Sequence, residues 1–348
     1  MNNNINNYQY FLNQYNSPLE NKRKSIKKAC SKIGFMIVIA TIVMNIIGII
    51  MEFILIAQGK VDLTMKTGIY GIPYIPMYLL NAFGEFSGFF IIPFLFCLIN
   101  KFRVRDAIPF NNNKKYNVFA MMIAGYSICV LANFAVSLLD INLSIFGFEN
   151  SVGFEFGADT LTDKIVYFTC VAIVPALTEE FTFRGVILNY LRKYGDGFAV
   201  LVSSILFGLV HGNLVQIPFA FIVGLVCGYI TIKTGTILPS VLLHLLNNGT
   251  SVLLDIAMKS VDNNTAELIS NGGMCLLMII SFITVVILVV KKGLDVKFNT
   301  TENEFSDIQP LDKVRCFLSN AGIITAIVIF SLSAFFTASS GILQSVQQ

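Results

Sequence analysis

Nine apolar stretches dominate the sequence, and several approach the ~20 residues that an α-helix needs to cross a bilayer. Charged residues make up only 13% of the chain, against about 25% in an average domain. A helix satisfies its own backbone hydrogen bonds inside lipid, so the pattern predicts an all-α, polytopic transmembrane bundle of about eight or nine spans. The expected spans are 34–57, 74–100, 117–139, 163–190, 196–212, 214–232, 236–257, 272–290 and 317–337.

Polar stretches divide the chain into four regions. Residues 1–33 are Asn- and Tyr-rich and end in a Lys/Arg cluster, which predicts a flexible, basic, cytoplasmic tail. Residues 34–292 form the predicted helix bundle, with its functional core at about 163–257. A polar cytoplasmic segment is expected at 293–316, followed by the last span and a short tail at 317–348.

The distribution of positive charge predicts the orientation. In this topology 19 of the 24 Lys and Arg residues fall on one side, four fall on the other, and Arg184 lies within a span. Lys and Arg collect on the cytoplasmic side of membrane proteins, so the N-terminus is expected in the cytoplasm. The frequent Asn, Ile and Lys are typical of AT-rich coding genomes, which suggests a bacterial plasma membrane.

Composition excludes some functions. The net charge of +3 is small, and the basic cluster abuts a membrane helix, which argues against nucleic acid as a partner. The seven cysteines are scattered, without a CxxC motif or a Cys/His ligand spacing, so we interpret them as small buried hydrophobes.

The stretch 176–185 places two carboxylates and a guanidinium inside an apolar run. A charged side chain near the bilayer centre costs at least ~2.5–3.5 kcal/mol on insertion scales. Glu180 and Arg184 are four residues apart and can pair on one helix face. Glu179 is turned about 100° away, which leaves its carboxylate free to act as a general base. The alternative for Glu180 and Arg184 is a purely architectural pair.

The only two histidines lie in later apolar segments. His244 and Asn248 are four residues apart and face the same way, as a metal ligand or an oxyanion donor. Counting from the predicted span ends puts Glu179, His211 and His244 roughly 13 to 23 Å from the cytoplasmic end, at 1.5 Å per residue. All three can therefore share one layer.

Other polar and small residues in the spans have simpler interpretations. Glu52, Glu85 and Asp255 lack an obvious partner in the sequence and lie toward predicted span ends, where solvation at the interface is expected. Gly224 and Gly228 have the spacing of a close-packed helix surface.

Three motifs resemble those of the CAAX prenyl protease and bacteriocin-processing family of intramembrane proteases. They are Glu179-Glu180 with Arg184, Phe207 with His211, and His244 with Asn248. The likeness covers about 163–250, roughly a quarter of the chain, with three motifs in order on separate apolar segments. The rest of the chain resembles the family only in being membrane-spanning.

The resemblance implies a membrane-embedded endopeptidase. Glu179 matches the catalytic glutamate that activates water, His211 its partner, and His244 with Asn248 the pair that steadies the oxyanion. Glu180 and Arg184 match the supporting positions. Glu179, His211 and His244 could hold zinc with one open position, or the glutamate could activate water without metal; the sequence leaves both open.

We therefore expect the hydrolysis of a peptide bond in a membrane-associated peptide or protein, near the cytoplasmic surface. A prenylated tail, a bacteriocin-like leader and a membrane-protein segment all fit as substrates. Two other functions stay open: a catalytically silent membrane interaction protein, such as a bacteriocin immunity or scaffolding factor, and a proton-coupled transporter using the buried carboxylates. No internal repeat of the kind common in transporters is apparent.

Overall fold

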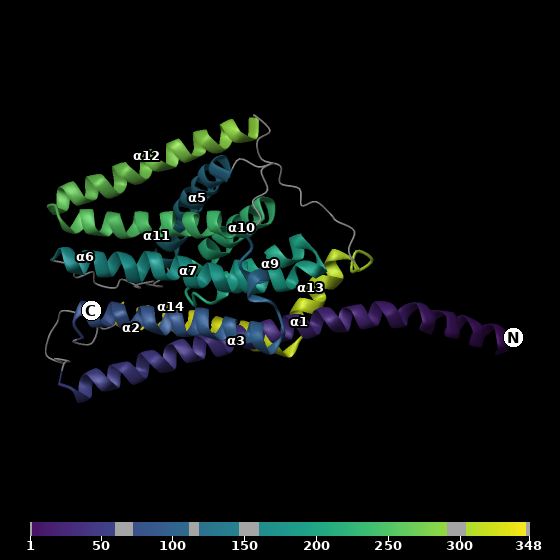
Figure 1. Cartoon of the computed structure of the whole chain (residues 1–348). Coiled ribbons are helices and arrows are strands. Elements are labelled where there is room, and N and C mark those ends of the chain that lie inside the picture. Colours follow the sequence, from purple (N-terminus) through teal and green to yellow (C-terminus); the bar gives the residue numbers. More distant parts are fainter. Residues whose placement is uncertain (1, 60–71, 111–117, 146–159, 291–303, 346–348) are drawn as a thin grey trace.

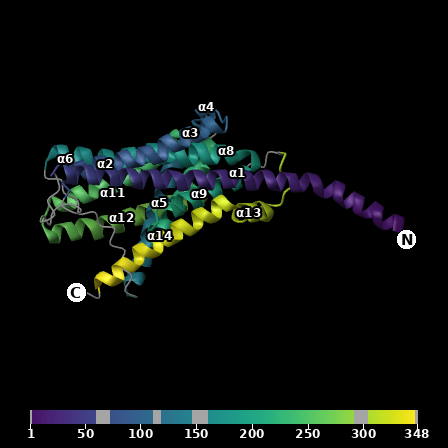
Figure 2. The same cartoon turned by 90° about the horizontal axis from the view of Figure 1, so that it is seen from below.

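The computed structural model describes residues 2–59, 72–110, 118–145, 160–290 and 304–345. Over these residues the chain is a bundle of helices (Figure 1), which confirms the predicted all-α class. Viewed from below, α1 runs the length of the bundle and projects beyond it at its N-terminal end (Figure 2).

The helices follow in two groups. The first comprises α1 (Asn2–Ala57), α2 (Tyr74–Phe86), η1 (Ser87–Ile91), α3 (Ile92–Ile99), α4 (Val104–Ala107), α5 (Val118–Ile145), α6 (Leu161–Phe168), η2 (Thr169–Ile173), α7 (Val174–Glu180) and η3 (Phe181–Leu188). The second comprises α8 (Asn189–Leu191), η4 (Arg192–Tyr194), α9 (Asp196–Leu209), α10 (Gln216–Thr234), α11 (Leu238–Lys259), α12 (Asn263–Val290), α13 (Pro310–Leu318) and α14 (Ala321–Ser345). Elements η1 to η3 are π-helical, and η4 is a 3₁₀ turn.

Seven helices in the described part of the chain are long and apolar enough to cross a membrane. They are Pro18–Ala57, Tyr74–Ile99, Val118–Leu143, Leu161–Tyr194, Gln216–Thr234, Leu238–Lys259 and Ala321–Ala338. The chain is therefore an integral, polytopic membrane protein. The predicted fifth and eighth spans coincide with shorter apolar helices, Asp196–Leu209 and Cys275–Ile287. Seven candidate spans are thus found in the described residues, against the eight or nine predicted, and Cys275–Ile287 is the apolar part of the longer α12.

Helix α9 is short for a physical reason. Its 14 residues extend only about 21 Å at 1.5 Å per residue. Gly212 has a left-handed φ of 56°, and the Asn213 side chain accepts hydrogen bonds from the backbone N–H groups of Val215 and Gln216. His211 therefore lies in the turn that follows α9, and our placement of it within a span 196–212 was wrong.

The crossing between α9 and α10 depends on small residues. A Cβ added to Gly224 would lie 2.9 Å from Cα of Ser204, and one on Gly228 would lie 3.0 Å from a methyl group of Val200. This confirms the predicted close-packed surface. Gly34 of α1 likewise crosses Gly322 of α14 so closely that neither position has room for a side chain.

The N-terminal region differs from the prediction. We expected residues 1–33 to be a flexible tail, yet α1 begins at Asn2 and is continuous with the first span. Ile26, Ala29, Cys30 and Ile33 are buried, and their helical spacing forms an apolar stripe that packs against α13 and α14. The stripe is difficult to recognise in the sequence because its residues alternate with those of the Lys/Arg cluster.

Polar contacts also hold this end of α1 in place. Lys22 pairs with Asp307 at 2.8 Å and Arg23 with Asp312 at 2.9 Å. The hydrogen bond and charge of Lys22 lower the pKa of Asp307. Lys313 donates to the carbonyl oxygen of Tyr194 at 2.7 Å, and burial lowers the pKa of its ammonium group. We name these contacts the α1–α13 clamp.

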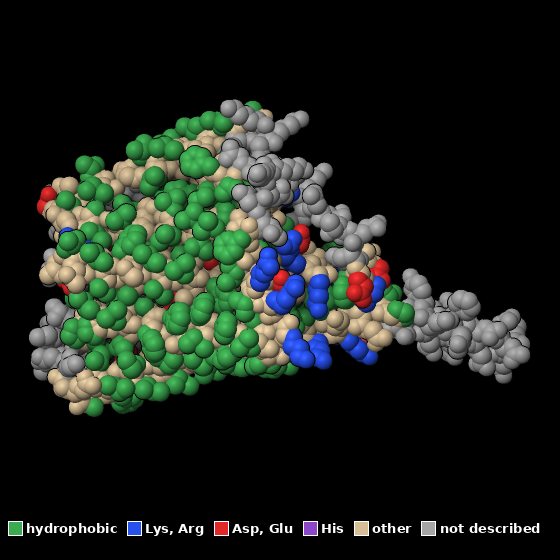
Figure 3. Space-filling view, in the orientation of Figure 1, with side chains coloured by type: hydrophobic (Ala, Val, Ile, Leu, Met, Phe, Trp, Pro, Cys, Tyr) green, Lys and Arg blue, Asp and Glu red, His purple; other side chains and the backbone are tan. Residues whose placement is uncertain are grey.

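The molecular surface is divided by residue type. Figure 3 shows Lys and Arg side chains gathered at one end of the bundle, next to a broad band of hydrophobic side chains. Large hydrophobic residues on α1, α5, α12 and α14 are exposed, among them Phe53, Ile141, Phe282 and Phe335. A lipid environment accounts for that exposure. Six of the seven cysteines are buried thiols, as expected, and Cys275 is exposed.

Candidate active site

Two π-helical stretches flank the helix that carries the paired glutamates. Helix α7 follows η2, has Pro175 in its first turn and passes into η3 directly after Glu180. Proline lacks a backbone N–H, and the wider π turns occur frequently at functional sites. The helical winding therefore changes on both sides of the α7 segment that carries Pro175, Glu179 and Glu180.

The predicted pair of Glu180 and Arg184 is present and fully buried. Oε1 of Glu180 lies 2.8 Å from Nη1 of Arg184, and both side chains have 0% exposure. The guanidinium carbon lies 4.3 Å from the centre of the Phe207 ring, a cation–π contact with α9. Neutralisation by Glu180 and the aromatic face together make a buried guanidinium tolerable.

Glu180 has a second partner that helical spacing did not reveal. Its Oε1 atom lies 3.0 Å from Nδ1 of His244 on α11, so one carboxylate joins α7, η3 and α11. A carboxylate only accepts, which places the proton of this contact on Nδ1. Nε2 of His244 then faces the other groups of the site.

Glu179 lies beside that second ring nitrogen. Its Oε2 atom is 3.8 Å from Nε2 of His244, a separation beyond a direct hydrogen bond. Oε2 is buried and makes no hydrogen bond among the residues that the structure describes. The prediction that one glutamate is paired and the other left open is confirmed.

Asn248 lies one helical turn beyond His244 and completes the same face of α11. Its Nδ2 atom is 3.3 Å from Nε2 of His244 and 3.4 Å from the carbonyl oxygen of Val171 in η2. Both contacts are long, so the amide N–H groups are held weakly and point between α11 and η2.

His211 reaches the cluster through Phe207. Nδ1 of His211 is 2.8 Å from the carbonyl oxygen of Phe207, which fixes the proton on Nδ1 and leaves Nε2 as an acceptor. The Phe207 ring meets the rings of His211 and His244 edge-on, at centroid distances of 5.1 and 5.8 Å. Glu179 and His244 are thus neighbours, and the Phe207 ring lies between His211 and His244.

Glu179, His211 and His244 are the residues that could hold a metal ion. Within the described residues, no group of three or more His, Cys, Asp and Glu side chains is placed to hold one. Nε2 of His244 meets the amide of Asn248, whereas the contact of each histidine Nδ1 with a protein oxygen is compatible with metal binding through Nε2. As arranged, Glu179, His211 and His244 do not fit a tetrahedral zinc site.

Sequence reasoning missed the role of a third carboxylate. Glu85 was expected to be solvated near a span end, but it lies well inside Tyr74–Ile99 and is half-buried. The hydroxyl of Thr178, the residue before Glu179, lies 2.8 Å from Oε1 of Glu85. Asp255 is also partnered, because it accepts a hydrogen bond from the Tyr167 hydroxyl at 2.8 Å. Lone acids give no spacing signal, so neither contact could be read from the sequence.

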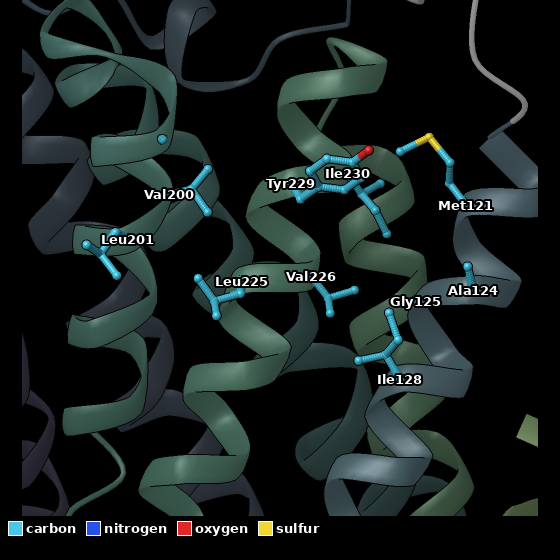
Figure 4. Close-up of a pocket in the computed structure, with 11 residues that line it drawn as sticks. Met121, Ala124, Gly125, Ile128, Val200, Leu201, Leu225, Val226, Tyr229 and Ile230 are labelled. Atoms are coloured by element: carbon cyan, nitrogen blue, oxygen red, sulfur yellow. The ribbon is translucent and has the colours of Figure 1, made fainter. Parts of the chain in front are cut away.

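A separate cavity of about 330 Å³ lies between α5, α9 and α10 (Figure 4). Its walls are apolar, with Tyr229 the one residue that carries a polar side chain among those drawn. None of the six candidate site residues lines it.

The fold and site together define a polytopic helical membrane protein with a buried cluster of Glu, His, Asn and Arg. Residues 161–250 match the family described as type II CAAX prenyl endopeptidase Rce1-like. The chain thus carries a domain of that family, and all six candidate residues lie inside it.

Two curated proteins are similar to parts of the chain. An uncharacterized 24.3 kDa protein of Escherichia coli is 32% identical over 96 residues, which are 26% of this chain and 44% of that protein. The "putative membrane peptidase YdiL" of Bacillus subtilis (strain 168) is 26% identical over 216 residues, which are 60% of this chain and 86% of that protein. No solved structure matches the chain.

Proposed function

We propose that the chain is an intramembrane endopeptidase, which hydrolyses a peptide bond of a membrane-associated peptide or protein. The observation that carries this proposal is the environment of Glu179. A buried carboxylate oxygen of Glu179, which has no hydrogen-bond partner in the described part of the chain, lies 3.8 Å from a nitrogen of His244, among spanning helices. Such an oxygen is suited to accept a proton from a bound water.

In the proposed reaction, Glu179 removes a proton from water as the water oxygen attacks the scissile carbonyl carbon. The Nε2 lone pair of His211 accepts the second water O–H and orients the nucleophile. When the C–N bond breaks, the proton held by Glu179 passes to the leaving nitrogen. The net change is the addition of one water molecule across the peptide bond.

His244 and Asn248 are proposed to stabilise the tetrahedral oxyanion. The amide of Asn248 is held only by long contacts, so it can turn toward a developing charge. Glu180 orients His244 through Nδ1, so that Nε2 faces the oxyanion, to which it would donate once it carries a proton. Arg184 in turn holds Glu180.

The proposed topology places the N-terminus in the cytoplasm, with hydrolysis near the cytoplasmic side. The gathering of Lys and Arg at one end of the bundle supports it (Figure 3). The family description favours a prenylated tail as substrate, while a bacteriocin-like leader or a membrane-protein segment also fits a site among spanning helices. Metal content of the purified protein distinguishes a zinc-dependent form from a metal-free one.

Comparison of membrane peptidomes tests the proposal. Cells from which the gene for this chain has been deleted receive wild type, Glu179→Gln or the matched control Glu20→Gln. Glu20 is an exposed glutamate near the start of the first span. We expect the cleavage products of wild type and control to be absent with Glu179→Gln, at equal levels of inserted protein. If instead the peptidome is the same with wild type, with Glu179→Gln and with the deletion, and Glu179→Gln complements the deletion fully, the chain is a membrane interaction protein that works without cleavage.

A further inference from the structure

A second cavity, of about 430 Å³, adjoins the candidate active site. It lies between α1, α2 and the α6–η2–α7 segment, and its volume is in the range of small-ligand sites. Residues that bear on its chemistry are Asn45, Gly48, Glu52, Asn81, Glu85 and Tyr167. We name it the α1–α2 cavity.

The shape of this cavity follows from a close helix crossing. A Cβ on Gly88 would lie 2.6 Å from the carbonyl oxygen of Ala40, and one on Gly84 would lie 3.1 Å from that of Met44. Helices α1 and α2 touch there and diverge toward the C-terminal end of α1 (Figure 1). The cavity lies between the two helices on the side of this crossing where they diverge.

Three contacts connect the cavity to the cluster around Glu179. Glu85 of the cavity wall accepts a hydrogen bond from the hydroxyl of Thr178, and Thr178 directly precedes Glu179 in the chain. Val171, another lining residue, accepts the Asn248 amide through its carbonyl oxygen. Pro175 lines the cavity one turn before Glu179. A peptide bond at Glu179 can therefore have its flanking side chain in the α1–α2 cavity.

The polar groups of the cavity are two carboxyl groups, the amides of Asn45 and Asn81, and the hydroxyls of Tyr78 and Tyr167. Glu52 and Glu85 contribute carboxyl groups, and no Lys, Arg or His is among the lining residues. The Asn45 amide nitrogen donates to the carbonyl oxygen of Thr41, which leaves the Asn45 oxygen for another donor. Tyr167 uses its hydroxyl hydrogen on Asp255. A cation with several N–H donors complements this set.

We propose that the α1–α2 cavity is a specificity pocket that receives a Lys or Arg side chain of the substrate, next to the scissile bond. Glu85 and Glu52 are the specificity-determining residues. The apolar walls accept the methylene stem, and the carboxylates meet the charged head. The inference rests on the proposed function, because it names a feature of the substrate cleaved by Glu179.

Binding is measured separately from cleavage. The full-length Glu179→Gln protein in phosphatidylcholine nanodiscs is titrated with fluorescent apolar peptides of about 20 residues, which carry one central Lys, Gln or Glu. We expect the Lys peptide to bind at least about fivefold more tightly than the Gln peptide, and the Glu peptide most weakly. Adding Glu52→Gln and Glu85→Gln should remove the Lys preference. The neutral lipid prevents the bilayer itself from concentrating the basic peptide.

Filling the cavity gives a second test that leaves its charges intact. A Cβ added to Gly48 meets nothing within 4 Å, so Gly48→Leu should fold and occupy the space. The matched control is Gly273→Leu on α12. An added Cβ at Gly273 also meets nothing within 4 Å, and Gly273 lines neither cavity. We expect Gly48→Leu to weaken binding of the Lys peptide about fivefold or more, and the control to leave it unchanged.

The outcomes separate this inference from the proposed function. Equal binding of the three peptides, a Lys preference that survives both glutamine substitutions, or undisturbed binding in Gly48→Leu would each overturn the specificity pocket. Absence of cleavage of all three peptides by the wild-type protein counts against the proposed function instead, because binding to the Glu179→Gln protein does not depend on it.

Discussion

Glu180 and His244 lie 64 positions apart in the chain and meet at 3.0 Å, through Oε1 of the carboxylate and Nδ1 of the ring. The same carboxylate oxygen pairs with Arg184 at 2.8 Å. Glu180 therefore stabilises a buried cation and also sets the orientation of a candidate catalytic histidine. These two roles can be separated by mutation.

Glu180→Gln is expected to lower both activity and stability. Loss of the carboxylate leaves Arg184 buried without its counter-charge, which costs about 3–5 kcal/mol. Loss of the oriented His244 ring should lower kcat by about 10- to 100-fold. Thermal unfolding in detergent and peptide cleavage measure the two effects.

The double variant Glu180→Met with Arg184→Met separates stability from catalysis. Replacing a buried ion pair by apolar side chains of similar volume is often neutral or stabilising, so this variant should regain most of the stability lost in Glu180→Gln. Activity should stay low, because Nδ1 of His244 still lacks its acceptor. Recovery of full activity would show that Glu180 is only structural.

Asn248→Ala is expected to act on the chemical step. Removal of one oxyanion donor typically lowers kcat by about 10²–10³-fold, while KM should change little because the amide interacts with charge that develops in the transition state. Ser251→Ala is the matched control, since Ser251 is exposed on the same helix. A change confined to KM would assign Asn248 to substrate binding.

Local features of this protein could be predicted from the sequence because they depend on spacing along one helix. Apolar length located the spans, and the interval of four residues between Glu180 and Arg184 predicted their ion pair, whose Oε1 and Nη1 atoms lie 2.8 Å apart. The interval between His244 and Asn248 likewise predicted a shared face. Each of these requires only the 3.6-residue helical repeat.

Contacts between helices could not be predicted in this way. The contact of Glu85 with Thr178 joins positions 93 apart, and neither residue has a partner at helical spacing. Which helices become neighbours depends on packing, such as the crossing of Gly88 and Ala40. The sequence does carry a signal for the turn after α9, because Gly212 followed by Asn213 is typical of a helix end. The apolar length of the segment led us to extend the span past it.

Gly212→Ala tests how the position of His211 is fixed. Gly212 has φ of 56°, and a Cβ there would lie 2.7 Å from the Ser333 hydroxyl oxygen of α14. Alanine is therefore strained by about 1–2 kcal/mol and should displace the turn that holds His211. We expect a lower midpoint of thermal unfolding and a lower kcat. Gly273→Ala, in open space at ordinary helical angles, should leave both unchanged or slightly raise stability.

The α1–α13 clamp should open at acidic pH. The pKa of Asp307 is lower in the folded protein than the ordinary 3.8, because Lys22 donates to it and carries the opposite charge. A depressed folded-state pKa adds stability that is present above the unfolded value and is lost as pH falls through the folded one. Proteolysis near the start of α1 should therefore accelerate as pH falls below about 4.

Asp307→Asn provides the control for this prediction. The variant lacks the Lys22 ion pair at every pH, so its cleavage near the start of α1 should be faster than wild type at neutral pH and less dependent on pH. High salt should bring wild type toward the variant, because the pair is partly exposed and exposed pairs are screened. An identical pH response in both proteins would assign the opening to other carboxylates, with Asp312 beside Arg23 as the first to examine.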